Sequence, residues 1–266
     1  MTVIAPRPAG DGVAHVVNLN LRGRTAMVTG AASGIGRAVA VRLAAASARV
    51  VAVDLAGDAL TAVASETGAV AMPLDLSIAE SLDRLAELDC TIVVNNAGLQ
   101  HVAPIQDLPG DRFAYIQRVM VEAPFRLVRG ALPAMYAAGW GRVVNISSVH
   151  GLVASPFKSA YVAAKHGLEG LSKVIALEGA PHGVTANCIN PGYVRTPLVE
   201  GQIAGQAHAH GIAEDEVLSK ILLTRSAIKR LIEPYEVAEL VAYLCTPAAA
   251  FITGASLTLD GGWTAS

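Results

Sequence analysis

The sequence contains few charged residues and few cysteines. Charged residues make up 16% of the 266 positions, and the formal net charge is −2. So little charge excludes a disordered chain, and the near balance of charges gives no reason to expect a nucleic-acid or membrane partner. Cys90, Cys188 and Cys245 are scattered and have no metal-ligand spacing. They predict small buried side chains in a reducing, cytoplasmic setting.

Long uninterrupted apolar segments are also lacking. Residues 1–20 have no continuous apolar core, so they predict a loose extension before the fold rather than a secretory signal. Residues 240–259 are uncharged and long enough to span a membrane, but a proline and a glycine interrupt them. A buried helix, loop and strand are the better interpretation. His208 and His210 do not share a helical face, so their spacing does not predict a metal site.

What the sequence has in abundance is apolar residues, which make up 53% of the chain. Short β-branched runs alternate with longer helical patterns, and several runs are apolar throughout, as in strands covered on both faces. The predicted strands are 25–30, 48–54, 69–75, 90–98, 141–148, 184–192 and 256–262. The predicted helices are 34–47, 57–67, 77–87, 109–138, 159–180 and 234–246. This order predicts an α/β fold with a doubly wound parallel sheet and ligands at the carboxyl ends of its strands.

A glycine-rich turn follows the first predicted strand, with Gly30, Gly34 and Gly36 in the pattern G-x-x-x-G-x-G. Such glycines let a pyrophosphate approach the backbone at the positive end of the next helix, although the turn could also be purely structural. Asp54 ends the second strand, where a carboxylate can accept hydrogen bonds from an adenosine ribose and repel a 2′-phosphate. The pattern therefore favours NAD over NADP, and the alternative for Asp54 is a helix cap.

Polar residues also end the next two predicted strands. Asp75 ends the third strand, and Asn95-Asn96-Ala97-Gly98 ends the fourth. Both groups would lie on the edge of the sheet where a cofactor is expected. As alternatives, Asp75 could form a turn or cap the next helix, and the asparagines could satisfy backbone groups at the strand end.

Ser148, Tyr161 and Lys165 form the candidate catalytic group. Ser148 ends the fifth predicted strand, and Tyr161 and Lys165 share one helical face four residues apart. A free tyrosine has a pKa of about 10, and an ammonium about 4 Å away would favour the phenolate by roughly 4 kcal/mol at an effective dielectric of about 20. Ser148 could donate a hydrogen bond to the substrate oxygen. Alone, the same residues could be an amphipathic helix pair and a strand-end hydroxyl.

Together, TGAASGIG, NNAG, NISS, the Tyr161/Lys165 pair and PGYVRTP have the order and spacing of the short-chain dehydrogenase/reductase family. The chain resembles this family over roughly residues 20–266. The resemblance implies one domain, residues 21–266, with a Rossmann-type seven-stranded parallel sheet, and a homotetramer. It makes Tyr161 the acid/base, Lys165 the holder of the nicotinamide ribose and Ser148 the residue that orients the substrate. The cofactor residues it implies are Gly30, Ser33, Gly34, Ile35, Gly36, Asp54, Leu55, Asp75, Leu76, Asn96, Ala97, Gly98, Tyr161, Lys165, Pro191, Gly192, Val194 and Thr196.

One position departs from the family pattern. Aligning Phe125 places Met120 where the family usually has an asparagine that anchors a water in the proton relay. A thioether is a poor acceptor and donates no hydrogen bond. Glu122 is close in sequence but is expected to point about 200° around the helix. The relay therefore needs another anchor, or proton exchange is slower.

Within the family, the chain resembles bacterial 3-hydroxybutyrate dehydrogenases in GLQHVAP, SVHGLVASPFKSAYVAAKHG, PGYVRTPLVEGQI and DGGWTAS. This resemblance implies oxidation of (R)-3-hydroxybutyrate to acetoacetate. The substrate residues it implies are Gln100, Ser148, His150, Lys158, Tyr161 and Gln202. Trp263 matches a tryptophan of these enzymes and could close the apolar side of the pocket. Tyr193 replaces a usual tryptophan and Phe157 a common polar residue.

Other interpretations stay open for the substrate region. Lys158 could be a solvated loop residue, and His150 an ordinary loop histidine. The substrate could be another small hydroxy acid, a secondary alcohol or a ketone. The chain could also be a nucleotide-binding scaffold with weak turnover. Residues 198–222 predict a mobile substrate lid of one or two short helices.

Overall fold

The computed structural model of the chain describes residues 19–86, 88–210 and 212–265, and most of the predicted extension at 1–20 lies outside them. The described chain forms a seven-stranded parallel sheet in the order β3-β2-β1-β4-β5-β6-β7. The strands are β1 (Thr25–Thr29), β2 (Arg49–Asp54), β3 (Val70–Pro73), β4 (Ile92–Asn95), β5 (Gly141–Ile146), β6 (Val184–Pro191) and β7 (Ser256–Leu259). The predicted single-domain, Rossmann-type fold is therefore confirmed.

The strand order reverses between β1 and β4, which are hydrogen-bonded neighbours although β2 and β3 lie between them in sequence. At such a switch point the two connections leave in opposite directions and open a crevice beyond the strand ends. β4, β5 and β6 are buried along their whole length. Their apolar runs follow from helices that cover both faces of the sheet.

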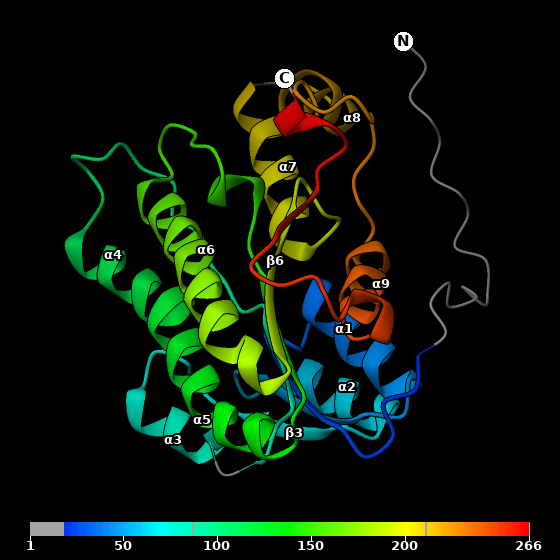
Figure 1. The fold of residues 1–266 in the computed structure, drawn as a ribbon. Helices are drawn as coiled ribbons and strands as arrows, with labels where there is room; N and C mark the ends of the chain where they lie inside the picture. Colours follow the sequence, from blue (N-terminus) through cyan, green and yellow to red (C-terminus); the bar gives the residue numbers. More distant parts are fainter. Residues whose placement is uncertain (1–18, 87, 211, 266) are drawn as a thin grey trace.

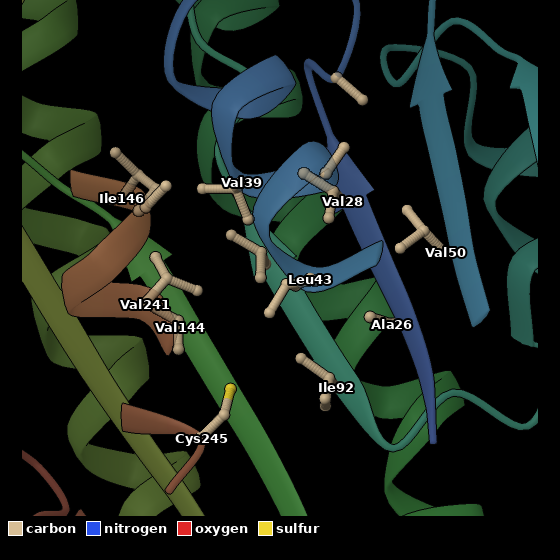
Figure 2. Packing of buried hydrophobic residues seen from close by; sticks show 14 of the residues in the cluster. Ala26, Val28, Val39, Leu43, Val50, Ile92, Val144, Ile146, Val241 and Cys245 are labelled. Carbon is tan, nitrogen blue, oxygen red and sulfur yellow. The ribbon is translucent and has the colours of Figure 1, made fainter. Parts of the chain in front are cut away.

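Three helices cover one face of the sheet (Figure 1). They are α1 (Gly34–Ala45), α2 (Asp58–Thr67) and α9 (Pro234–Leu244). Val39 and Leu43 of α1 pack with Val241 of α9 against β-strand residues such as Val28 and Val144 (Figure 2). α1 and α9 meet in this way because the connections after β1 and β6 cross the same face.

Helices also cover the other face of the sheet, and one of them carries Tyr161 and Lys165 (Figure 1). They are α3 (Ala79–Ala86), α4 (Gly110–Gln117), α5 (Ala123–Ala137) and α6 (Ser159–Gly179). The predicted helix at 109–138 is interrupted by one π-helical segment, Arg118–Glu122, between α4 and α5. Met120 lies in this segment and is only 1% exposed. Such π-bulges in an α-helix are frequent at functional sites.

A smaller helical layer lies beyond the carboxyl ends of the strands, at the top of Figure 1. It consists of α7 (Pro197–His210), α8 (Glu214–Val217) and the π-helical segment Leu218–Leu222. Val199, Ile203, Val217 and Leu222 form an apolar cluster of their own, and Tyr193 packs against it. This layer is the segment that the sequence predicted as a lid.

The three cysteines are free and buried, as predicted. Burial raises the pKa of each thiol, to about 12 for Cys90 and Cys245. These cysteines therefore act as small apolar side chains rather than as nucleophiles. Within the described part of the chain, no helix is long and apolar enough to cross a membrane.

Candidate active site

The turn between β1 and α1 has no room for a side chain at its three glycine positions. A Cβ at Gly36 would lie 2.0 Å from the Gly30 carbonyl oxygen, and one at Gly30 would lie 2.8 Å from Nδ2 of Asn96. Gly30 and Gly34 also have φ angles of +64° and +52°, which favour glycine. A Cβ at Gly34 would lie 2.9 Å from Cγ2 of Thr196, so two predicted cofactor residues far apart in sequence meet here.

Asn96 holds this turn in place from the end of β4. Its Nδ2 donates to the carbonyl oxygens of Thr29 at 2.9 Å and Gly30 at 3.2 Å. Oγ1 of Thr29 in turn accepts from the backbone amides of Asn96 and Ala97. The side chain of Asn96 therefore shapes the cofactor turn, in line with the alternative that it satisfies backbone groups at strand ends.

Asp54 links the end of β2 to the same turn. Its Oδ2 accepts from the amide of Ala32 at 2.8 Å, and its Oδ1 accepts from the amide of Leu55 at 2.7 Å. Asp54 does not cap α2, because the residue at the N-cap position is Gly57. Each carboxylate oxygen can accept a further bond, which leaves acceptor capacity for a ribose hydroxyl.

The remaining predicted cofactor residues line the same edge of the sheet. Asp75 follows β3 and accepts from the Ser77 amide at 2.8 Å, which supports the turn interpretation. Ser33 stands at the N-cap of α1 without a side-chain hydrogen bond to the helix. The others lie at the start of α1, at the end of β6 or just after β2, β3, β4 and β6: Ile35, Leu55, Leu76, Ala97, Gly98, Pro191, Gly192 and Val194.

These features fit a dinucleotide. The glycines keep the turn tight against its neighbours, and the N-terminus of the 12-residue α1 has no side-chain cap at Ser33. Free backbone amides and the helix dipole together favour an anion at this point. Asp54 ends β2 and Asp75 follows β3, the next strand in the sheet, where hydroxyl and amide donors of an adenosine could bind.

Ser148 and His150 lie on one short turn after β5. Oγ of Ser148 accepts from the backbone amide of His150 at 3.1 Å and lies 3.5 Å from its Nδ1. Nε2 of His150 lies 2.9 Å from Oγ of Ser155. Burial, followed by the charges of Lys158, Arg225 and His166, lowers the pKa of His150 to about 4. His150 is therefore neutral at physiological pH.

Tyr161 and Lys165 lie on the face of α6 that points toward Ser148. Burial raises the pKa of Tyr161, and a hydrogen bond with Ser148 opposes this. Nζ of Lys165 donates to the carbonyl oxygen of Ile146 at 2.6 Å and lies 5.5 Å from the centroid of the Tyr161 ring. Burial lowers the pKa of Lys165 to about 8.

The direction of the Tyr161 shift differs from the expectation that Lys165 lowers this pKa. The lysine is near, but its hydrogen bond goes to a backbone carbonyl, and loss of solvent disfavours the phenolate. The sequence could not signal this contact, because any residue type supplies a carbonyl oxygen.

The other predicted substrate residues follow β4, precede α6 or lie on α7. Lys158 precedes α6 and is partly buried, and burial lowers its pKa. Nε2 of Gln100 is buried without a hydrogen-bond partner. Gln202 lies on α7, but its side chain is outside the described part of the structure.

An aromatic wall closes one side of the site. The rings of Tyr193 and Trp263 stack with centroids 5.7 Å apart, and His150 meets the Trp263 ring edge-on at 5.6 Å. Nε1 of Trp263 is buried without a hydrogen-bond partner. The wall brings together residues after β5, after β6 and near the carboxyl terminus, so no local sequence pattern could predict it.

Asn190 is a residue of this site that the sequence interpretation missed. It is fully buried in β6, and its Nδ2 donates to the Ser148 carbonyl oxygen at 2.9 Å. The available signal was an amide side chain within a predicted strand that is mostly apolar. Glu122, in contrast, is exposed and pairs with Arg126 at 2.9 Å, so it does not replace the missing asparagine at Met120.

Comparison with known proteins identifies the class. Residues 30–264 match the family model described as enoyl-(acyl carrier protein) reductase. The chain belongs to the short-chain dehydrogenase/reductase family, as the sequence motifs predicted, and is a nicotinamide-dependent dehydrogenase.

The particular relatives are also informative. D-beta-hydroxybutyrate dehydrogenase of Rhizobium meliloti (strain 1021) is 46% identical over 255 residues, which cover 91% of this chain and 99% of that protein. A crystal structure from Beutenbergia cavernae with NADP at low occupancy has a TM-score of 0.84 and 33% identity, over 94% of this chain and 100% of that one. 4-Hydroxyisoleucine dehydrogenase complexed with NADH has a TM-score of 0.82 and 31% identity, over 92% and 100%.

Proposed function

We propose that this dehydrogenase oxidises (R)-3-hydroxybutyrate to acetoacetate with NAD. The observation that carries the proposal is the partly buried ammonium of Lys158, whose charge acts on His150 next to Ser148 and Tyr161. A cation withdrawn from solvent at this place can hold a carboxylate next to the reacting carbon. The 46% identity to a D-beta-hydroxybutyrate dehydrogenase supports the same substrate class.

The proposed chemistry needs one proton acceptor and one hydride acceptor. Tyr161, as phenolate, removes the proton of the substrate hydroxyl, while Ser148 donates a hydrogen bond to the same oxygen. A bound nicotinamide supplies the hydride acceptor, and its positive charge favours the phenolate. Burial alone raises the pKa of Tyr161, so this additional positive charge is needed to make the phenolate accessible.

Lys165 has two proposed tasks in this arrangement. Its Nζ already bonds the Ile146 carbonyl oxygen at 2.6 Å, which fixes one of its three donors and points the ammonium toward the end of β5. The other two donors are available for the nicotinamide ribose and for solvent. Its charge adds to the field that favours the Tyr161 phenolate.

For the substrate carboxylate, we assign Lys158 as the ionic partner and Gln100, His150 and Gln202 as neutral donors. Nε2 of Gln100 is a buried donor without a partner, which a bound carboxylate would satisfy. The stacked rings of Tyr193 and Trp263 would contact the apolar end of a four-carbon acid. Residues 198–222 would close over this site as the lid.

We propose NAD rather than NADP as the cofactor because Asp54 places a carboxylate where the ribose of the adenosine would lie. Its two oxygens are oriented by the amides of Ala32 and Leu55, so the charge is held at the cofactor turn. A 2′-phosphate would meet like charge there. The assembly we propose is a homotetramer in the cytoplasm, with contacts made by α4, α5 and α6.

Turnover with a panel of substrates tests this function. The panel contains short 2- and 3-hydroxy acids, neutral secondary alcohols and cyclic alcohols, each with NAD and with NADP. We expect the highest kcat/KM for (R)-3-hydroxybutyrate with NAD. A higher value for a neutral alcohol, or for another hydroxy acid, would replace the substrate assignment, and no turnover at all would favour a binding scaffold.

A further inference from the structure

A buried carboxylate lies beneath the turn that carries Ser148 and His150. Glu169 of α6 is only 5% exposed, although it is a charged residue. Its Oε1 accepts from Nδ2 of Asn190 at 2.5 Å, and its Oε2 accepts from Oγ of Ser256 at 2.6 Å. One glutamate thus joins α6 to the end of β6 and the start of β7. Burying such a group is unfavourable unless its hydrogen bonds are made.

Asn190 connects Glu169 to the turn that carries Ser148. The same Nδ2 that donates to Glu169 also donates to the carbonyl oxygen of Ser148 at 2.9 Å. Two acceptors face one another here, and only a group with two hydrogens can bridge them. The carboxylate therefore fixes the orientation of the Asn190 amide, because the reversed amide would place an oxygen between two acceptors.

Gly151 of the same turn lies directly against the Glu169 carboxylate. A Cβ at Gly151 would lie 2.9 Å from Oε1 of Glu169 and 2.5 Å from Oγ of Ser147. The backbone amide of Gly151 bonds the Ser148 carbonyl oxygen, which is the same oxygen that accepts from Asn190. The path from Glu169 to Ser148 is therefore a continuous series of short contacts.

We propose that Glu169 is a positioning residue for the reaction: through Asn190 it holds the turn that presents Ser148 to the substrate oxygen. This role rests on the proposed catalytic use of Ser148. Glu169 touches neither the substrate nor the cofactor in this account. Its loss lets the turn shift, and a misplacement of about 1 Å lowers a rate by up to about 100-fold.

Two variants of Glu169 and one control variant test the proposal at pH 6.5, below the Lys165 pKa of about 8. Glu169→Met keeps the volume and removes both acceptors, and we expect kcat to fall about 10- to 100-fold with KM for NAD changed less than about twofold. Glu169→Gln keeps an acceptor for Asn190 and a donor for the Ser256 hydroxyl, and should restore most of kcat. The matched control Glu178→Met, at an exposed glutamate of the same helix, should leave kcat unchanged.

Non-additivity gives a second readout. If Glu169 acts through Asn190, Asn190→Ala should lower kcat by a similar factor, and the double variant with Glu169→Met should lose little more. Fully multiplicative losses would overturn the proposal, as would wild-type kcat in Glu169→Met or failure of Glu169→Gln to restore activity. If Glu169→Met does not fold by circular dichroism, the Asn190→Ala kcat and KM values decide alone.

A readout independent of the substrate separates this proposal from the proposed function. Hydrogen exchange of the peptide spanning residues 147–152 should be faster in Glu169→Met than in wild type and unchanged in Glu169→Gln. Equal exchange in all three would overturn the positioning role. If wild type oxidises none of the acids tested, the proposed function fails, while the exchange comparison still tests Glu169.

Discussion

The Asp54 carboxylate accepts a hydrogen bond from the Ala32 backbone amide at 2.8 Å, which ties the end of β2 to the glycine-rich turn. The contact fixes a negative charge at the end of β2, where we propose that the ribose of the adenosine lies. Ser33 and Gly34 follow in the same turn, so the charge and the N-terminus of α1 lie close together. A cofactor with a 2′-phosphate would have to displace or neutralise this charge.

Asp54→Asn should therefore weaken the preference for NAD. The amide keeps an acceptor for Ala32 but loses the charge, so the ratio of kcat/KM for NAD to that for NADP should fall about 10-fold, equivalent to about 1.4 kcal/mol. Steady-state kinetics with both cofactors measure the ratio. Asp58→Asn, at the start of α2, serves as the matched control. Equal or better kcat/KM with NADP in wild type would contradict the cofactor assignment.

Met120 lies buried in the π-helical segment between α4 and α5, next to Gly98. If the missing polar anchor limits proton exchange, Met120→Asn should raise kcat without much change in KM for NAD. The measurement is steady-state kcat together with the solvent isotope effect on it. An unchanged kcat would show that another group or water anchors the relay, or that product release limits turnover.

The lowered pKa of His150 makes the stability of the fold depend on pH. Its folded-state pKa of about 4 is below its ordinary value of 6.5, chiefly because of burial. The neutral His150 side chain therefore makes its full contribution to the free energy of unfolding above pH 6.5. This contribution is lost as the pH falls from 6.5 through about 4, because the unfolded chain binds the proton first. The loss amounts to about 3 kcal/mol at most.

Thermal unfolding between pH 7 and pH 4 measures this contribution. Tm should fall more steeply in wild type than in His150→Gln, which has no titrating group at this position. His101→Gln, on a neighbouring loop, is the control and should follow wild type. Parallel curves for wild type and His150→Gln would show that His150 does not titrate as a buried neutral group.

Exposed apolar side chains predict the assembly. Leu177 is 79% and Val174 50% exposed on α6, and Phe125 of α5 is 48% exposed. We expect these helices to pair between subunits in a homotetramer, because isolated chains rarely leave such patches uncovered. Leu177→Glu should yield a smaller species by light scattering at micromolar concentration, while Ile78→Glu, outside these helices, should not. A monomeric wild type would contradict the prediction.

Most of the sheet could be predicted from the sequence because burial on both faces leaves a strong signal. Runs such as VVAV in β2 and IVV in β4 are apolar on both sides of the strand, and polar residues such as Asp54 and Asn95 mark their ends. The glycine turn was predictable because only glycine fits positions such as Gly36. The predicted helix at 109–138 contained no signal for its π-helical segment.

The parts that could not be predicted depend on tertiary contacts. Lys165 bonds a backbone carbonyl, which no residue pattern marks. Glu169 stands in a helix where a charged residue ordinarily indicates a solvated face, yet it is buried because Asn190 and Ser256 reach it from two strands. Phe157 has a φ of +66°, a conformation that its side chain gives no reason to expect.

The substrate assignment depends on Lys158. If this cation pairs with the carboxylate, Lys158→Ala should lower kcat/KM for (R)-3-hydroxybutyrate about 10- to 150-fold, since a hydrogen bond to a charged group contributes roughly 1.5–3 kcal/mol. KM for NAD should hardly change, because the cofactor site uses other residues. Lys173→Ala, at an exposed lysine of α6, is the matched control and should behave as wild type. Losses of Gln100 or Gln202 should be smaller, because both are neutral donors.

The most direct test of the account is steady-state NADH formation by wild type and Lys158→Ala with (R)-3-hydroxybutyrate, its S enantiomer and neutral 2-butanol. The account predicts that wild type prefers the R acid over both other compounds and that Lys158→Ala loses most of its preference for the acid over 2-butanol. A wild type that prefers 2-butanol, or a Lys158→Ala variant that oxidises the acid as well as wild type does, would contradict it.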